Sequence, residues 1–225
     1  ARITVLAEAG EQWAGVVGTV KKLAEQAGAL VGDGPLVNLV LQAVVGAWPI
    51  SQERVLDYAL KAAREAGNST AWVDGDAGFE QRLTRFVELV HHDPQMRAVV
   101  EGFAEHVTAA GWANGLAAKL VQLTMPGVPD VYQGSELWAE SLVDPDNRRP
   151  VDFGARAAGL ARLDTPGGGT ADGIPAVGPD GAAKLLVVQR LEGWDAQGLK
   201  GFSSILHSNV EPASSTYAID ACISR

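Results

Sequence analysis

Residues 125–138 read MPGVPDVYQGSELW, and this stretch decides how the rest of the chain is interpreted. Its apolar residues Val128, Val131 and Tyr132 lie between turns rich in proline and glycine, in a segment that is too short for a helix. The pattern predicts one short buried strand. Because a single strand cannot form a sheet, its pairing partners must lie elsewhere, either in this chain or outside it.

The sequence before this stretch has the pattern of consecutive helices. Apolar residues recur every three or four positions, and the windows end at GDGP (32–35), at Gly67 and at Asp93-Pro94, which a helix does not continue through. The apolar segment 36–48 is a buried helix or, from its β-branched residues alone, a buried strand, and its length favours a helix. The other helical windows are 12–31, 52–66, 79–92, 96–107 and 112–123.

The overall composition excludes several classes of function. The chain carries 18 basic and 27 acidic residues, a formal net charge of −9, and this balance is opposite to that of a nucleic-acid-binding protein. No uncharged apolar run reaches the roughly 18 residues needed to cross a bilayer. We therefore expect neither a nucleic acid nor a membrane as a partner.

Two features of the sequence bear on the cellular location and on completeness. Cys222 is the single cysteine and cannot form an intramolecular disulfide, which favours a reducing compartment and predicts a cytoplasmic protein. The N-terminal ARITVLAEAGEQW lacks signal-peptide features and begins within an apolar pattern. We expect the chain to be part of a larger protein.

The sequence contains no convincing metal or cofactor site. His91 and His92 are adjacent, and neighbouring helical residues diverge by about 100°, so they cannot both face one ion. With Asp93 they are interpreted as a polar helix end. No G-x-S-x-G elbow and no phosphate-binding glycine loop is present. We expect no metal, no cofactor and no catalytic residue of these kinds.

The cluster between Tyr132 and Arg149 is more informative. It combines aromatic rings with carboxylates, amides and arginines, which is what a sugar requires, because its C–H faces stack on rings and its hydroxyls form paired hydrogen bonds. An Asp–Arg network that only holds a loop in place explains the same residues. The cluster comprises Tyr132, Gln133, Glu136, Trp138, Asp144, Asp146, Asn147, Arg148 and Arg149.

The segment LTMPGVPDVYQGSELWAESLVDPDNRRPVDF (123–153) closely resembles the C-terminal part of bacterial maltooligosyltrehalose synthases, members of the α-amylase superfamily of (β/α)₈-barrel enzymes. Similar segments occur upstream in the same order, at residues 1–13, 41–50 and 61–72. The resemblance spans roughly residues 1–190, and DPDNRRPVDF behind PGVPDVYQG is its most specific element. It also favours a helix for KLLVVQ (184–189), which β-branching alone would make a strand.

The resemblance implies an isomerase that converts the reducing-end α-1,4 linkage of a maltooligosaccharide into an α,α-1,1 linkage, an intramolecular transglucosylation in trehalose biosynthesis. The superfamily uses a carboxylate nucleophile, a general acid/base and a third carboxylate that stabilises the distorted sugar. In the family these three precede the segment that matches ARITVLAE. No catalytic residue is therefore assigned to this chain, and we expect it to be inactive without the missing N-terminal barrel portion of the enzyme.

The resemblance also implies a set of substrate-binding residues. Arg148 matches an arginine near the innermost sugar subsites, and Asp144 is its expected ion-pair partner. Glu136 and Trp138 are expected at the rim of the pocket, whereas Tyr132 lies either at the pocket or in the barrel interior. The family motif that contains Lys61 and Arg64 has no assigned role.

The expected fold is mainly α with few short strands, as the end of a partial (β/α)₈ barrel, its last strand and helices, plus a helical insertion. Residues 1–124 form the helical region, residues 125–162 the last barrel strand with its pocket loop and following helix, and residues 163–190 a linker and the start of the C-terminal region. Residues 191–225 depart from the family pattern and form a divergent or non-native tail. The alternative function is a non-catalytic helical module that binds a glucan or a partner protein.

Overall fold

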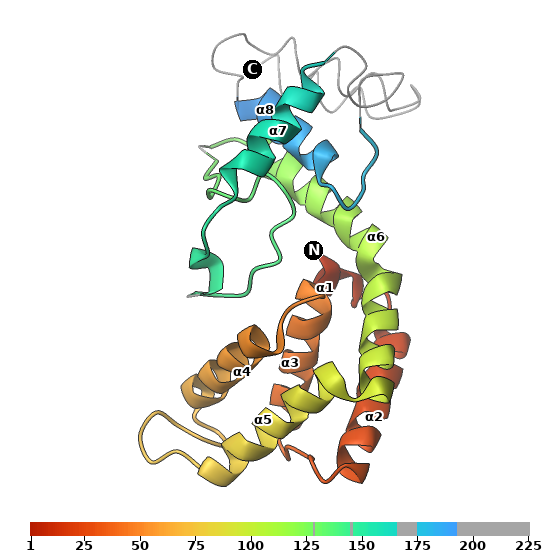
Figure 1. Cartoon of the computed structure of the whole chain (residues 1–225), viewed down its shortest axis with the longest axis vertical. Coiled ribbons are helices and arrows are strands. Elements are labelled where there is room, and N and C mark those ends of the chain that lie inside the picture. The colour runs from red at the N-terminus through yellow and green to blue at the C-terminus, as the bar shows by residue number, and fades with distance from the viewer. Residues whose placement is uncertain (128, 145, 166–174, 193–225) are drawn as a thin grey trace. The chain divides into compact units, whose positions relative to one another are not determined.

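The structure is a computed structural model that describes residues 1–192 apart from residues 128, 145 and 166–174. This part of the chain is helical (Figure 1). It divides into two units, each described by itself: unit 1 contains Ala1–Ala117 and Ala139–Val151, and unit 2 contains Ala118–Trp138 and the described residues from Asp152 onward. The elements are α1 (Arg2–Val5), α2 (Gly10–Gln26), α3 (Gly34–Ala47), α4 (Gln52–Ala66), α5 (Ala77–His92), α6 (Pro94–Thr124), the 3₁₀ helix η1 (Asp146–Arg148), α7 (Phe153–Leu163) and α8 (Ala182–Glu192).

Side-chain caps define where α3, α4 and α5 of unit 1 begin. The carboxylates of Asp33 and Asp76 and the hydroxyl of Ser51 each accept a hydrogen bond from the backbone N–H three residues later, at the start of α3, α5 and α4. Helix α4 ends at Gly67, whose φ of 67° lies in the left-handed region that glycine adopts without strain. The predicted end of this helix is confirmed.

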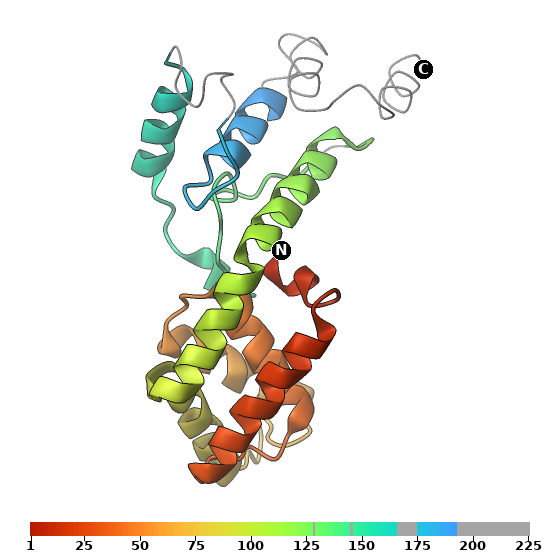
Figure 2. The ribbon, with the colours of Figure 1, turned by 90° about the vertical axis from the view of Figure 1, so that its right-hand side faces the viewer.

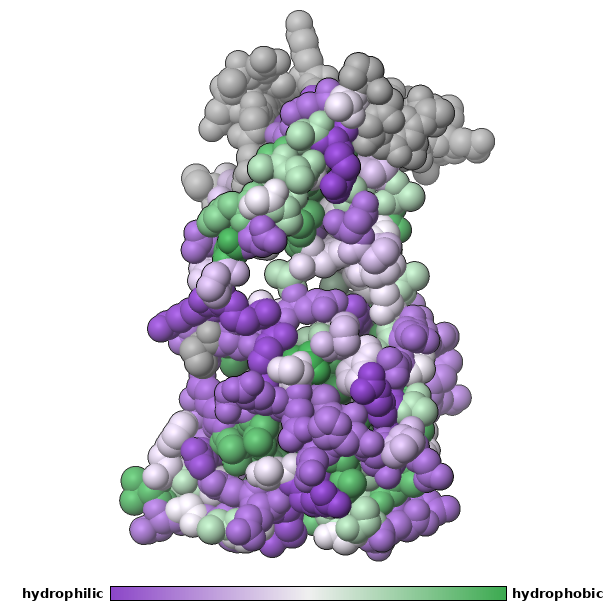
Figure 3. All heavy atoms as spheres, viewed as in Figure 1, coloured by the Kyte–Doolittle hydropathy of each residue, from purple (hydrophilic) through white to green (hydrophobic). Residues whose placement is uncertain are grey.

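The core of unit 1 is built around α3. Val40, Leu41, Val44 and Val45 on this helix are all fully buried, which confirms that the apolar segment 36–48 forms a buried helix. Helix α3 packs against α1 and α4, and α2 lies beside the first half of α6 (Figures 1 and 2), where the rings of Trp13 and Phe103 are 5.5 Å apart. The outward face of unit 1 is mostly hydrophilic, with separate apolar spots (Figure 3).

Unit 2 contains the last residues of α6 together with α7 and α8. The two shorter helices pack closely at Gly159, where an added Cβ atom would lie 2.7 Å from the Leu185 side chain. Leu185 and Val188 of α8 are buried. The helix predicted for residues 184–189 is therefore confirmed.

The strand predicted within residues 125–138 is wrong. The described residues of this stretch form turns and irregular backbone, and no strand occurs in the part of the chain that the structure describes. Pro126 and Pro129 have no N–H to donate to a ladder, and Gly127 has a φ of 131°. The predicted partial barrel end with its last strand is corrected accordingly: the described units are helical.

Two helix predictions differ from the structure in extent. Helix α2 ends at Gln26 rather than near Val31, because Gly28 adopts a φ of 66°, and Leu30 is consequently 45% exposed. The windows 96–107 and 112–123 belong to one helix, α6. The predicted tail at 191–225 lies outside the described residues, apart from the two that end α8. None of the described helices combines the length and the apolar character needed to cross a bilayer.

Candidate functional site

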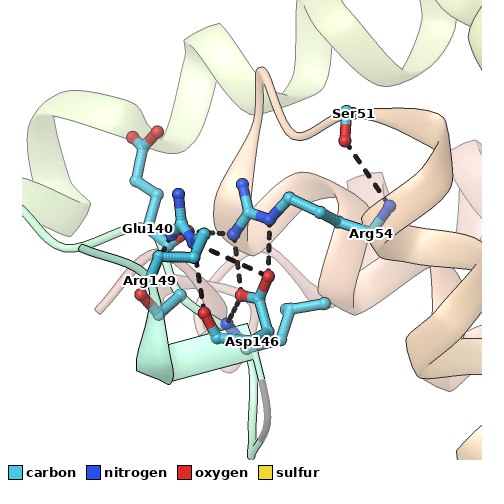
Figure 4. A network of polar contacts seen from close by, with 7 residues as sticks. Ser51, Arg54, Glu140, Asp146 and Arg149 are labelled. Carbon is cyan, nitrogen blue, oxygen red and sulfur yellow. Dashed lines mark hydrogen bonds and ion pairs between the residues drawn. The ribbon is translucent and has the colours of Figure 1, made fainter.

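The segment 139–151 is held against helix α4 by one arginine. Arg54, in the first turn of α4, donates two hydrogen bonds to the Asp146 carboxylate, at 2.6 and 2.8 Å, and a third to the Glu140 carbonyl at 2.6 Å (Figure 4). The Arg54 and Asp146 side chains are 23% and 14% exposed. A bidentate pair of this kind is both strong and geometrically specific.

Asp146 is the centre of this network. Its second carboxylate oxygen also accepts a hydrogen bond from the Leu142 backbone N–H at 2.7 Å. The hydrogen bonds from Arg54 are the main reason that the pKa of Asp146 lies below its ordinary value, and the same contact raises the pKa of Arg54. Asp146 therefore stays ionised and ties η1 both to α4 and to the preceding turn.

Arg149 closes the network from the other end of η1. Its Nε donates to the Asp146 carbonyl at 3.1 Å, and its Nη2 donates to the Glu140 carbonyl at 3.2 Å and to the Ser141 hydroxyl at 3.1 Å (Figure 4). Every one of these acceptors belongs to the segment itself. Arg149 therefore maintains the shape of the loop.

A second anchor lies at Arg2, which is buried although it is charged. It donates to the Trp48 carbonyl at 2.5 Å and to the Glu140 carboxylate at 2.6 Å. Its stem passes Gly111 of α6, where an added Cβ atom would lie 2.6 Å from the Arg2 Cγ. Glycine at this position therefore provides the space for the anchor.

The predicted pair of Asp144 and Arg148 is formed, and it lies at the surface. Arg148 Nε and Nη2 lie 2.5 and 3.0 Å from the two carboxylate oxygens of Asp144, and the side chains of Arg148 and Asp144 are 71% and 52% exposed. Lys61 of α4 donates to the Asp144 carbonyl at 2.6 Å, which positions the backbone and leaves the carboxylate to Arg148. Both charged groups retain room for additional hydrogen bonds.

In unit 2, Glu136 is engaged with Arg156 of α7. Arg156 donates to the Glu136 carboxylate at 2.7 Å and to the Gly134 carbonyl at 2.6 Å, while the Gly134 N–H donates to the other carboxylate oxygen at 3.2 Å. Burial by itself raises the pKa of Glu136, but the hydrogen bonds from Arg156 and from the backbone outweigh it and lower this pKa. Glu136 therefore stabilises the turn at 134–136.

Trp138 is held by the segment that leads into α8. Its Nε1 donates to the Gly178 carbonyl at 2.7 Å, and the Lys184 ammonium lies 5.3 Å from its ring centroid. Lys184 is buried and donates to the Leu137 carbonyl at 2.8 Å. Burial, followed by the nearby charge of Lys119, lowers the pKa of Lys184 to about 8. Tyr132 in contrast is 55% exposed.

Comparison with known proteins relates this geometry to one enzyme family. A solved maltooligosyltrehalose synthase from Arthrobacter ramosus shares 54% sequence identity and a TM-score of 0.76, over 84% of this chain and 24% of that chain. A Mycobacterium tuberculosis H37Rv protein named maltooligosyl trehalose synthase is 42% identical over 173 residues, 74% of this chain and 22% of the relative. A solved structure described as DSM5389 glycosyltrehalose synthase shares 28% identity and a TM-score of 0.73. No family model matches the chain.

This chain is homologous to one region of maltooligosyltrehalose synthase. It spans only about a quarter of the length of the synthases that it matches. The resemblance read from DPDNRRPVDF is therefore confirmed at the level of the family.

The structure distributes the five residues predicted to bind substrate over two units. Asp144 and Arg148 belong to unit 1, and Tyr132, Glu136 and Trp138 belong to unit 2, so it does not establish one site from all five. Asp144 and Arg148 are joined in an exposed pair. Glu136 and Trp138 are each committed to contacts within their own unit.

The sequence did not predict the contacts that α4 makes with the segment 139–151. Arg54 lies 92 positions before Asp146 along the chain, and this separation carries no local signal in the sequence. The motif at 61–72 is now divided: Lys61 contacts the Asp144 carbonyl, whereas Arg64 pairs with Glu80 of α5 at 2.6 and 2.9 Å. Arg64 therefore holds two helices together.

The two adjacent histidines have separate partners. His91 is buried, with Nδ1 2.8 Å from the Val87 carbonyl, and His92 Nε2 lies 2.7 Å from the Gln52 side-chain oxygen. The structure thus agrees with their interpretation as a polar helix end. Within the described ranges, no group of three or more His, Cys, Asp or Glu side chains is placed to hold a metal ion.

Proposed function

We propose that this chain forms part of a maltooligosyltrehalose synthase. In that enzyme the reducing-end α-1,4 linkage of a maltooligosaccharide is converted to an α,α-1,1 linkage by intramolecular transglucosylation, a step of trehalose biosynthesis. The observation that carries the proposal is the 54% identity to a solved synthase, with a TM-score of 0.76 over 84% of the chain.

The contribution proposed for this region is substrate binding rather than bond cleavage. Asp144 and Arg148 form an exposed bidentate pair on a loop whose backbone is fixed by Arg54, Asp146 and Arg149. A sugar hydroxyl both donates and accepts, so an adjacent carboxylate and guanidinium satisfy it in both senses. A loop that is already ordered loses little conformational entropy when it binds.

Tyr132, Glu136 and Trp138 are proposed as further substrate contacts in the complete enzyme. The exposed ring of Tyr132 offers an apolar face to a sugar ring. The carboxylate of Glu136 accepts one hydrogen bond on each oxygen in unit 2 and has lone pairs for more. Trp138 uses its indole N–H for the Gly178 carbonyl, so its part in binding is confined to its ring.

The chemical step needs groups that we do not assign to this chain. A retaining transglucosylation requires a nucleophilic carboxylate and a general acid/base on opposite sides of the scissile bond. The released glucose must then turn over and be recaptured before water attacks, which requires a closed pocket. We propose that the remainder of the synthase is the essential partner and that this chain alone is inactive.

The proposal is tested by product analysis with maltopentaose. The complete synthase that contains this region is expected to form a product with an α,α-1,1 linkage, and the 225-residue chain is expected to form none. A complete enzyme that only hydrolyses the oligosaccharide would contradict the isomerase assignment. Turnover by the isolated chain would contradict the proposal that the catalytic groups belong to the remainder of the synthase.

A further inference from the structure

A small pocket in unit 1 is lined jointly by α4 and by residues 142–144 and Asp146. Its volume is about 130 Å³. A cavity of roughly 150 Å³ holds one benzene molecule, so this pocket can receive part of a single sugar unit and is too small for an oligosaccharide. Its walls include Asp57, Tyr58 and Lys61 from α4 and Leu142, Val143 and Asp144 from the segment.

The polar groups of this pocket fall into two classes. Arg54 and Asp146, which also line it, are already bound to each other by the bidentate contact. The Asp57 carboxylate and the Tyr58 hydroxyl, in contrast, have no hydrogen-bond or ion-pair partner among the described residues. Lys61 donates one hydrogen bond to the Asp144 carbonyl and lies 3.8 Å from Glu65. Because its ammonium has three N–H donors, it can donate a further hydrogen bond. One acceptor group, one hydroxyl and one donor thus border the same space.

The charges around the pocket select for a neutral ligand. Lys61 lies 3.8 Å from the Glu65 carboxylate and forms no ion pair with Asp57, while Arg54 balances Asp146 and Arg148 balances Asp144. A phosphate would meet the uncompensated Asp57, and an apolar molecule would leave the polar groups without partners. A ring that carries hydroxyls around an apolar face satisfies the polar groups and also covers Leu142, Val143 and the Tyr58 ring.

We infer that this pocket is a subsite for one glucosyl unit, with Asp57 and Tyr58 as its recognition residues and Lys61 joining it to the Asp144–Arg148 pair. The inference deepens the proposed function and rests on it for the identity of the sugar. Burial raises the pKa of the Tyr58 phenol, so this group remains a hydrogen-bond donor throughout the neutral range.

The subsite is tested directly with the 225-residue chain. A ¹⁵N-labelled sample is titrated with maltose, and the amide signals of residues 57–61 and 142–144 are expected to shift saturably. Asp57→Ala should weaken binding about tenfold, as for loss of a hydrogen bond to a charged group, and Tyr58→Phe should weaken it severalfold. Glu105→Gln, an exposed change on α6, is the matched control and should bind as the wild type does.

Thermal melts of the variants separate binding from folding, because Asp57 is exposed on a helix that tolerates alanine. Absence of a saturable shift at these amides, or binding unchanged in both variants, overturns the subsite. An active complete synthase whose KM for maltopentaose is unchanged by Asp57→Ala also overturns it and leaves the proposed function intact. Maltose binding at these residues, with no 1,1-linked product from the complete enzyme, sinks the proposed function and keeps the subsite.

Discussion

Two carboxylates of one short loop, Asp146 and Asp144, each pair with an arginine, the first with Arg54 of α4 and the second with Arg148 of the loop itself. Arg54–Asp146 and Arg148–Asp144 have nearly equal contact distances, 2.6 and 2.5 Å, yet the first pair is 23% and 14% exposed and the second 71% and 52%. The first also gains bonds to two backbone groups. Distance alone therefore does not separate a pair that holds the fold from an exposed pair that is open to further contacts, whereas burial and additional partners do.

The largest expected effect comes from breaking the less exposed pair, Arg54–Asp146, which is called the inner pair below. Asp146→Ala leaves the Arg54 guanidinium and the Leu142 N–H without their acceptor, which should lower the free energy of unfolding by about 2–3 kcal/mol. Urea denaturation of the chain measures it. Asp144→Ala is the matched control, and an equal loss in both variants would erase the distinction between the pairs.

A second test concerns the Arg2 anchor at the start of the loop. Gly111→Ala would place Cβ 2.6 Å from Arg2 Cγ and 3.0 Å from its Cα, so we expect a loss of about 1–2 kcal/mol from overpacking. Gly102→Ala on the same helix has no atom within 4 Å of the new Cβ and should be neutral or stabilising. If both substitutions stabilise the protein, the anchor is not tightly packed.

Acid should weaken two ion pairs of unit 1, Arg54–Asp146 and Arg64–Glu80. The pKa of Asp146 is lowered by Arg54, and that of Glu80 is lowered to about 2 by Arg64 and Thr70. A lowered folded-state pKa gives stability that is complete above the ordinary value of about 4–4.5 and is lost as pH falls toward the folded-state value. Denaturation followed from pH 6 to pH 2 should show this decline. Glu80→Gln should flatten it, and an unchanged slope would contradict the assignment.

The smallest effect on stability is expected from breaking the more exposed pair, Arg148–Asp144, which is called the outer pair below. Asp144→Ala and Arg148→Ala remove a contact that is largely solvated, so each should change the free energy of unfolding by no more than about 0.5 kcal/mol. Urea denaturation of both variants, next to Asp146→Ala, measures the contrast. A loss above 2 kcal/mol in either would make the outer pair structural as well.

Local patterns in the sequence predicted most helices, and the family resemblance predicted the Asp144–Arg148 pair. Caps such as Asp33 and Ser51, and the end at Gly67, depend on neighbouring residues and can therefore be predicted from sequence. The strand predicted within 125–138 was wrong because a few apolar residues between turns do not supply the hydrogen-bond partner that a strand requires. Pro126 and Pro129 were evidence against it.

The contacts that hold the candidate site in place could not be predicted from neighbouring residues. Arg54 reaches Asp146 across 92 positions and Arg2 reaches Glu140 across 138, and only the packing of α4 and α6 brings them together. The motif DPDNRR predicted the right kinds of residue but not their division. Asp146 is bound by Arg54 of α4, Arg149 bonds to backbone of its own segment, and Asp144 and Arg148 form an exposed pair. The partners of each side chain decide that division, and those partners are a property of the fold.

The most direct test of this division is Arg148→Ala in the complete synthase, with kcat/KM for maltopentaose and the melting temperature measured together. Arg85→Ala is the matched control, because Arg85 is 54% exposed and paired with Glu88 in the same unit. We predict that kcat/KM falls about ten- to a hundredfold for Arg148→Ala, as for loss of a charged hydrogen bond, with no change in melting temperature and no effect of Arg85→Ala. Unchanged kcat/KM, or a loss that follows a lowered melting temperature, would contradict the account.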